Sequence, residues 1–281
     1  MPTYPLRHLN TDDIPQMLAL YQKVGWGHRA AALKQLLMWC GQGAFGITFR
    51  KTLIATSTAI MYGQQRGWIG MVATDPAYQK QGFGSRITDT AIDHLKTRQV
   101  KEIMLYASGM GLPVYLRRGF RTVSRVNTWV GIAPGQVSAP RLSSLRADDV
   151  DIATRLDGHA FGVERPQVMK TLITARGNRG WIIADRAFII AQEWHEQSVK
   201  LGSWVANNAE NAESLLLAAM QALPDYQLII SVPEENEIAA GILEKHQFAI
   251  TNTLARMIYG DVPDPVMRNQ AYFGVVNLAV G

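Results

Sequence analysis

The segment from Asp75 to Ser85 holds the residues of this 281-residue chain whose types and spacing best suit chemistry. Glycines stand at positions 82 and 84, directly after an apolar run, 68–74, that has strand character and directly before an amphipathic pattern over 85–98. Backbone N–H groups of a glycine loop, together with the free N–H groups of the following helix, form a site for an anion. The spacing therefore predicts a phosphate-binding loop between a strand and a helix.

Two common phosphate loops do not fit this segment. No Gly-Lys-Ser/Thr sequence follows the glycines, as a nucleoside triphosphate loop requires, and no further glycine precedes them at the spacing of a dinucleotide turn. The segment therefore matches neither of these two loops.

A known family has such a loop. Val72 to Gly84 resembles the pyrophosphate loop of GNAT acetyltransferases, whose pattern Gln/Arg-x-x-Gly-x-Gly/Ala is matched in full by Gln79, Gly82 and Gly84. The stretch 105–120 is similar to the next GNAT element, a strand, a short helix bearing a tyrosine and then Gly-Phe. Over nearly the whole chain the sequence resembles bacterial two-domain GNAT proteins with a YitH-type C-terminal domain. The residues that carry this resemblance are Gly25-Trp26-Gly27, Trp68 to Met71, Phe161-Gly162, Arg165, Asn236, Arg256-Met257 and Gly281.

The resemblance implies a co-substrate and a set of site residues. Acetyl-CoA is the expected co-substrate, without a metal, and the amine acceptor is expected to attack the thioester directly. Tyr115 corresponds to the tyrosine that protonates the departing thiolate, although a packing role in its short helix is the alternative. The expected acetyl-CoA-binding residues are Met71, Val72, Ala73, Thr74, Gln79, Lys80, Gln81, Gly82, Phe83, Gly84 and Ser85.

The general base is not assigned by the sequence. An alkylammonium of pKa about 10.4 must lose a proton before attack, which costs roughly 4.6 kcal/mol at pH 7. Many GNAT enzymes carry a glutamate on the strand before the loop, whereas residues 69–72 here contain no carboxylate. We expect Asp75 to shape the turn before Pro76 and His94 to lie on a solvated helix face.

The two halves of the chain repeat one pattern. Residues 8–14 match 144–150, 45–47 match 181–183, and 53–55 match 189–191, all at an offset of 136, whereas 115–120 match 243–248 at an offset of 128. The lost residues fall at the glycine loop, which the second half replaces by 208–214. We expect a catalytic GNAT domain at 1–135 with the acetyl-CoA loop, a linker, and a degenerate GNAT-like domain at 140–281 without it.

The fold class expected from the resemblance is α/β, a tandem GNAT fold in which each domain is a mixed, mainly antiparallel sheet flanked by helices. The patterns of the first half predict these elements: strand 4–9, helices 12–22 and 30–40, hairpin 44–61, strand 67–74, helix 85–98, strand 101–107, helix 112–118 and strand 120–131.

Charge is distributed unevenly between the halves. Residues 1–139 carry 16 Lys and Arg against 6 Asp and Glu, a net of +10, whereas residues 140–281 carry 12 against 17, a net of −5. The basic half suits a polyanion, and the acidic half suits a cationic amine such as a polyamine, an amino sugar or a lysine-like compound. The second domain is expected to supply acceptor contacts, with the candidates Asp157, Glu164, Glu234 and Glu235.

Several functional classes are disfavoured. Lys and Arg are dispersed without a nucleic-acid motif, no apolar run reaches the length of a membrane span, and Cys40, the only cysteine, is expected to be a small buried hydrophobe. We expect a cytoplasmic monomer or homodimer that acetylates a small-molecule amine. The alternatives are a protein acetyltransferase acting on lysine or an N-terminus, which needs an open groove, and a non-catalytic acyl-CoA-binding sensor.

Overall fold

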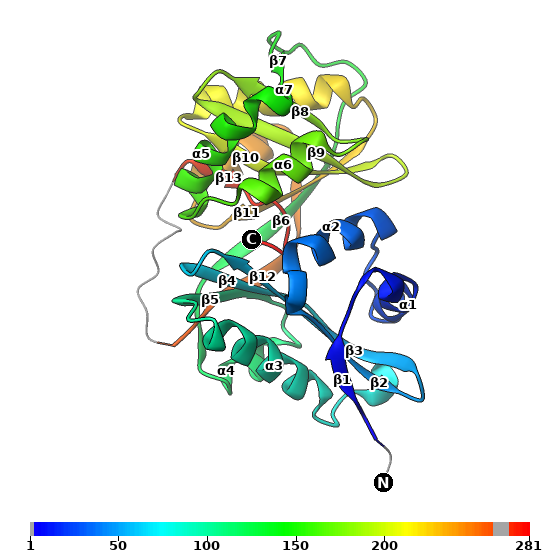
Figure 1. The fold of residues 1–281 in the computed structure, drawn as a ribbon. Coiled ribbons are helices and arrows are strands. Elements are labelled where there is room, and N and C mark those ends of the chain that lie inside the picture. The colour runs from blue at the N-terminus through cyan, green and yellow to red at the C-terminus, as the bar shows by residue number, and fades with distance from the viewer. Residues whose placement is uncertain (1–2, 261–269) are drawn as a thin grey trace. The chain divides into compact units, whose positions relative to one another are not determined.

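The computed structural model describes residues 3–260 and 270–281 and divides into two compact units. Unit 1 contains the described residues up to Arg121, together with 257–260 and Val280. Unit 2 contains Thr122–Arg256, the described residues 270–279 and Gly281. Figure 1 labels the elements of both units.

Unit 1 has the alternation of strands and helices that the sequence predicts. Its elements are β1 (Leu6–His8), α1 (Ile14–Lys23), α2 (Ala30–Cys40), β2 (Ala44–Phe49), β3 (Thr52–Tyr62), β4 (Arg66–Thr74), α3 (Phe83–Thr97), β5 (Glu102–Ala107), α4 (Leu112–Leu116) and the start of β6 (Phe120–Ile132). The strand order is β1-β2-β3-β4-β5-β12. The pairs from β1 to β4 are antiparallel, and β4 and β5 are parallel.

Unit 2 repeats this order. Its elements are β7 (Ser143–Ser144), α5 (Val150–Phe161), α6 (Pro166–Thr174), β8 (Arg179–Ile183), β9 (Ala187–His195), β10 (Ser198–Ala206), α7 (Ala209–Ala222), β11 (Gln227–Pro233), α8 (Glu237–Lys245), most of β12 (Ala249–Tyr259) and β13 (Tyr272–Gly274). The strand order is β12-β6-β11-β10-β9-β8-β7, and β13 pairs with β10. The parallel pair is β10 with β11, in the same place in the order as β4 and β5.

The repeat that the sequence shows corresponds to equivalent elements. The matched tripeptides 45–47 and 181–183 lie on β2 and β8, and 53–55 and 189–191 lie on β3 and β9. Each unit is a mixed, mainly antiparallel sheet with helices, so the predicted fold class is confirmed.

The division between the units differs from the one expected at 135–140. It falls at Arg121, inside β6, because the rest of β6 pairs antiparallel with β11 from Val126 to Ile132. Conversely, the end of β12 belongs to unit 1. There Gly260 N donates a hydrogen bond to Gly119 O at 2.9 Å, and the ring centroids of Phe120 and Tyr259 lie 5.3 Å apart. The two halves of the sequence thus exchange a strand.

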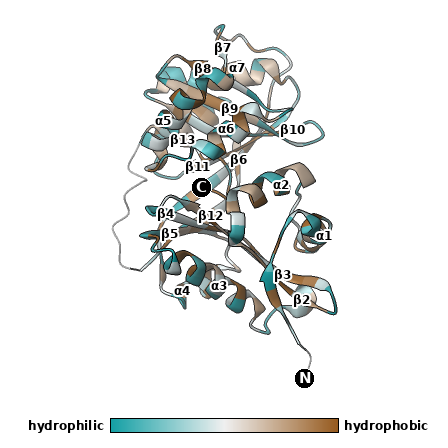
Figure 2. Ribbon diagram, viewed as in Figure 1, coloured by the Kyte–Doolittle hydropathy of each residue, from teal (hydrophilic) through white to brown (hydrophobic). Residues whose placement is uncertain are grey.

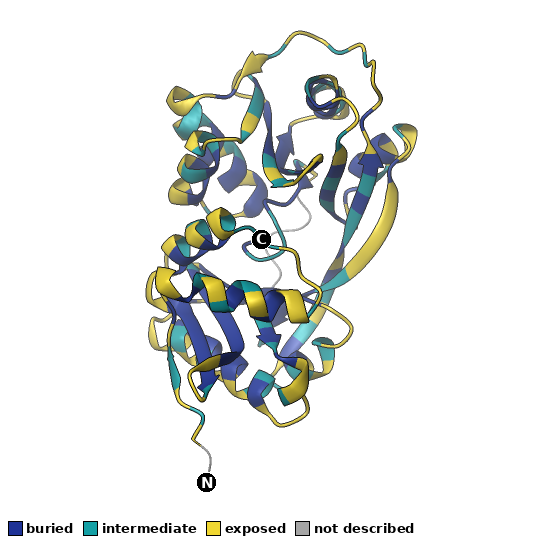
Figure 3. Cartoon of the chain, turned by 90° about the vertical axis from the view of Figure 1, so that its right-hand side faces the viewer, coloured by how far each residue is buried: buried dark blue, intermediate teal, exposed yellow. Residues whose placement is uncertain are grey.

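Each sheet packs its helices on apolar side chains. In α3, Ile87, Ala91 and Leu95 recur every four residues and are fully buried, which places them on one helix face. Figure 2 shows hydrophobic residues along the strands and mixed residues around α3. Figure 3 shows many strands buried, whereas the first half of β12 is exposed. Within the described residues, no helix has both the length and the apolar character to span a membrane.

Candidate active site

Strands β4 and β5 separate towards their carboxyl ends. Their parallel pairing covers Arg66–Trp68 against residues 102–104, and β4 then continues to Thr74 and β5 to Ala107. Backbone N–H and C=O groups in the separated part need partners, and an extended ligand can supply them as an added strand would. Residues 71–74, predicted to bind acetyl-CoA, lie in this separated part.

A β-bulge marks the middle of β4. Thr58 pairs with Gly70 and Thr56 with Ala73, so that Met71 and Val72 together face one residue of β3. Met71 has a φ of 50°, in the left-handed region, and its carbonyl accepts a hydrogen bond of 2.9 Å from Thr56 Oγ1. Bulges bend a strand and redirect its side chains. The sequence gives no signal for this bulge, because methionine does not favour a positive φ.

Asp75 shapes the turn after β4, as predicted. Its Oδ1 accepts a hydrogen bond of 3.0 Å from the N–H of Ala77, and its Oδ2 lies 2.7 Å from Lys23 Nζ. Burial opposes ionisation of Asp75, but the bonds from Lys23 and Ala77 outweigh it and hold the pKa of this carboxyl below its usual value. Asp75 is therefore a structural anion that joins the turn to α1.

The loop itself presents its backbone outwards. Lys80 and Gly82 have φ values of 60° and 87°, and Gly82 is the N-cap of α3. A glycine cap has no side chain with which to bind the N–H groups of the first helical turn, and the space beside Gly82 is open, with no atom within 4 Å of an added Cβ. Left-handed residues before a 15-residue helix whose cap has no side chain are an arrangement that suits an anion.

The side chains of the loop hold its shape. Gln79 Nε2 donates to the carbonyl of Thr74 at 3.2 Å, and Gln81 Nε2 donates to the carbonyl of Ala77 at 3.3 Å. Phe83 is buried, with its ring 4.7 Å from that of Tyr4 and 6.2 Å from that of Tyr78. The glutamine and aromatic side chains thus support the loop, and its backbone is left to contact a ligand.

Tyr115 is buried in α4, which follows β5. Its ring lies 5.8 Å from that of Phe120, and its side chain is 6% exposed. Burial raises the pKa of the Tyr115 phenol far above its ordinary value, against a smaller opposite effect of Arg118. The phenol is protonated at neutral pH with or without this shift, and the raised pKa makes it a weaker proton donor. Its ring also packs the helix.

Arg66 and Glu102 form a buried ion pair where β4 and β5 are still joined. The two are register partners, and Arg66 Nη2 lies 2.7 Å from Glu102 Oε2. Because this carboxylate is already paired, it does not replace the glutamate that is missing from residues 69–72. Sequence reasoning did not find the pair, since its members lie 36 residues apart.

The expectation for His94 was wrong. The side chain is partly buried rather than solvated, with its ring 5.2 Å from that of Phe45. Burial, helped by the charges of Arg98 and His8, lowers the pKa of His94 to about 4. Cys40 is buried as expected, and burial raises the pKa of its thiol.

The described residues of unit 2 contain no counterpart of the loop. Only two residues, Asn207 and Asn208, separate β10 from α7, and the side chain of Asn208 accepts a hydrogen bond of 2.8 Å from Asn211 N. This helix start is therefore capped by the chain itself, unlike that of α3.

Asp157 was wrongly expected to contact the acceptor. It is fully buried and accepts hydrogen bonds from Arg165 Nε at 2.7 Å and from Ser203 Oγ at 2.7 Å. Among the other candidates, Glu164 and Glu234 are exposed, and Glu235 lies 3.6 Å from Arg256.

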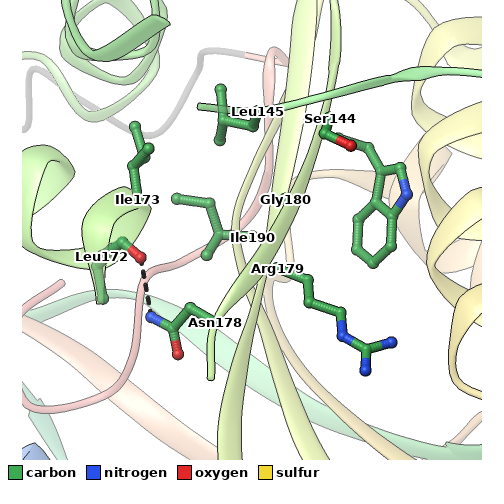
Figure 4. Close-up of a pocket in the computed structure, with 9 residues that line it drawn as sticks. Ser144, Leu145, Leu172, Ile173, Asn178, Arg179, Gly180 and Ile190 are labelled. Carbon is green, nitrogen blue, oxygen red and sulfur yellow. Dashed lines mark hydrogen bonds between the residues drawn. The ribbon is translucent and has the colours of Figure 1, made fainter. Parts of the chain in front are cut away.

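Two surface hollows contain none of the predicted site residues. One, of about 280 Å³ in unit 2, is shown in Figure 4 and is lined by Ser144, Leu145, Leu172, Ile173, Asn178, Arg179, Gly180, Trp181 and Ile190. The other, of about 490 Å³ in unit 1, is lined by Thr3, Pro5, Arg7, Gln16, Thr48, Arg50 and Lys51. The candidate site is therefore described by the backbone geometry of β4 and of the loop after it.

Comparison with known proteins gives matches in both halves. A model of the Acetyltransferase (GNAT) family matches residues 11–120, and one of the Acetyltransferase (GNAT) domain matches residues 153–274. A solved structure of a putative acetyltransferase from Pyrococcus horikoshii has a TM-score of 0.85 at 21% identity, covering 99% of this chain and 96% of that one.

Two curated relatives match part of the chain. The uncharacterized N-acetyltransferase YitH of Bacillus subtilis is 27% identical over 170 residues, 59% of each chain. The holothin acyltransferase of a Pseudoalteromonas species is 24% identical over 190 residues, 64% of this chain and 62% of the relative. The match thus spans about three fifths of the length of these relatives.

Proposed function

We propose that this protein, which belongs to the GNAT acetyltransferases and carries two GNAT domains in tandem, transfers the acetyl group of acetyl-CoA to the amine of a small cationic molecule. The observation that carries the proposal is the separation of β4 from β5, which ends in the Asp75 turn, the glycine loop and the uncapped start of α3.

The loop and the strand suit the two parts of coenzyme A. The pyrophosphate is placed against the backbone of residues 79–85, where the positive end of the α3 dipole and the N–H groups of the first turn favour it. The amide groups of the pantetheine arm pair with the free backbone of residues 71–74, as a strand added to an open edge does. The thioester then lies beside the separated strands.

The chemistry is direct transfer. The neutral amine attacks the thioester carbonyl, the C–N bond forms, the C–S bond breaks, and the thiolate of coenzyme A leaves. We assign the donation of a proton to this thiolate to the phenol of Tyr115, on α4 directly after β5. Residues 69–72 of β4 carry no carboxylate to take the proton of the amine. The proton that nitrogen releases as the amide forms passes to solvent, and Tyr115 regains from solvent the proton that it gives to sulfur.

The class of acceptor rests on charge. The half of the sequence that contains the loop has a net charge of +10 and the other half −5, and a field of this kind favours phosphates on one part of the protein and a cation on the other. A relative named holothin acyltransferase supports acyl transfer as the reaction.

The test is a screen of acceptors with acetyl-CoA and detection of the released thiol. Polyamines, amino sugars and lysine-like compounds are compared with lysine peptides and with peptides that have a free N-terminus. We expect turnover with a small cationic amine and one acetyl-CoA bound per chain by calorimetry. If only peptides are acetylated, the acceptor is a protein and not a small cationic amine. If acetyl-CoA binds but no acceptor leads to release of the thiol, the protein is a non-catalytic acyl-CoA sensor.

A further inference from the structure

Strands β10 and β11 of unit 2 separate as β4 and β5 do. Their parallel pairing covers residues 198–201 with 227–230, and β10 then continues to Ala206 and β11 to Pro233. A bulge lies in the equivalent place, because Leu201 pairs with Ala191 of β9 and Trp204 with Ile189. The opening in unit 2 is thus equivalent to the one that we assign to the pantetheine arm in unit 1.

Residues 271–276 of the chain itself lie in this opening. Strand β13 pairs antiparallel with β10, with Trp204 opposite Gly274 and Val205 opposite Tyr272. On the other side, Val275 N donates to the carbonyl of Ser231 on β11 at 2.9 Å. One segment therefore forms hydrogen bonds with both separated strands.

The packing of this segment is that of a core element. Tyr272, Phe273, Val275 and Val276 are each 1% exposed. Gly202, in the bulge of β10, lets the backbones approach, because an added Cβ there would overlap the carbonyl of Val275. No space beside β10 is left at this point for another extended ligand.

Polar side chains of unit 2 hold the segment in place. Arg165, which is paired with Asp157, donates from Nη2 to the hydroxyl of Tyr272 at 2.9 Å and from Nη1 to the carbonyl of Gly281 at 2.8 Å. Asn236 Nδ2 donates to the carbonyl of Tyr272 at 3.1 Å. The buried ion pair of Asp157 and Arg165 thus fixes residues 271–276 in the opening between β10 and β11.

We infer that residues 271–276 are a built-in ligand of unit 2, which occupies the position that the pantetheine arm takes in unit 1 and closes this groove to acyl-CoA. The comparison with pantetheine rests on the proposed function. The occupation of the groove does not, because it follows from the hydrogen bonds and burial within unit 2. In the second GNAT domain the groove between β10 and β11 is thus filled by a peptide segment of the same chain.

Hydrogen exchange on the full chain, with and without acetyl-CoA, tests the inference. Amides of 272–276 and of 204–206 should exchange as slowly as those of a central strand and should not respond to acetyl-CoA, whereas amides of 69–74 should become protected. Fast exchange at 272–276 in the free protein, or a rise there on addition of acetyl-CoA, would overturn the inference. Absence of any change at 69–74 would count only against the proposed function.

A matched pair of variants adds a second readout. Gly202→Ala should displace the segment, raising exchange at 272–276 at least about tenfold and lowering the Tm. Gly241→Ala, in α8 of the same unit, places its Cβ in open space and should do neither. Should Gly202→Ala not fold, Tyr272→Phe removes the hydroxyl that Arg165 bonds and that also interacts with the backbone of Val276. This variant should raise exchange in the same segment to a smaller extent. Unchanged protection of the segment in both Gly202→Ala and Tyr272→Phe would contradict the inference.

Discussion

Lys23 Nζ lies 2.7 Å from Asp75 Oδ2, and this ion pair joins the last turn of α1 to the turn that leads from β4 into the glycine loop. Asp75 is buried, but the Lys23 side chain is 52% exposed, so solvent weakens the attraction. The pair therefore matters more for the position of the turn than for global stability.

The first prediction concerns this pair. Lys23→Met should lower stability by no more than about 1 kcal/mol and should weaken acetyl-CoA binding more than stability, because the turn before the loop is loosened. The pKa of Asp75 is held below 3.8 in the folded state, so the stability it contributes is present above that pH and is lost as the pH falls below it. The difference in Tm between wild type and Asp75→Asn should therefore shrink below pH 3.8. A constant difference would contradict the role of the charge.

The two glycines of the loop should behave differently. Gly82 has a φ of 87°, so Gly82→Ala should cost about 1–2 kcal/mol of stability as well as affinity for acetyl-CoA. At Gly84 a Cβ would lie 3.4 Å from Thr74 Oγ1, an ordinary contact. Gly84→Ala should therefore keep its Tm and lose affinity only through crowding of the pyrophosphate. Calorimetry and thermal unfolding separate the two effects, with Gly109→Ala as the control in open space.

Tyr115→Phe separates proton donation from packing. The ring contact with Phe120 is kept, so the Tm and the affinity for acetyl-CoA should change little, whereas kcat should fall by about 10²–10⁴-fold. Steady-state kinetics with an acceptor found in the screen gives the answer. A normal kcat would leave Tyr115 with a packing role alone.

His94 should make stability depend on pH. Its pKa is lowered to about 4 in the folded protein, whereas in the unfolded chain it is about 6.5. As the pH falls below 6.5 the unfolded state takes up a proton that the folded state does not, so stability should decrease between pH 6.5 and 4. In His94→Gln this decrease should be smaller, as measured by denaturant unfolding at each pH. An equal decrease in both proteins would show that another group is responsible.

The elements that the sequence predicts correctly are those with local signals. Helix α3 follows from apolar residues spaced by four, and the loop before it follows from Gln79, Gly82 and Gly84. The expectations for Asp157 and His94 failed for one reason. Whether a charged or titratable side chain is solvated depends on what packs against it, and its partners here come from other elements: Ser203 on β10 bonds Asp157, and Phe45 on β2 contacts His94.

The sequence by itself determined the order of helices and strands, the glycine loop and the internal repeat, because periodicity, turn residues and short motifs act over a few neighbouring residues. Only the tertiary structure decided that β6 and β12 are exchanged between the units, that β4 bulges at Met71 and that residues 271–276 fill the groove of unit 2. Strand partners are chosen by hydrogen bonds and burial between segments far apart in the chain. The local sequence of Tyr272–Gly274 contains no signal that identifies the two strands with which this segment forms hydrogen bonds.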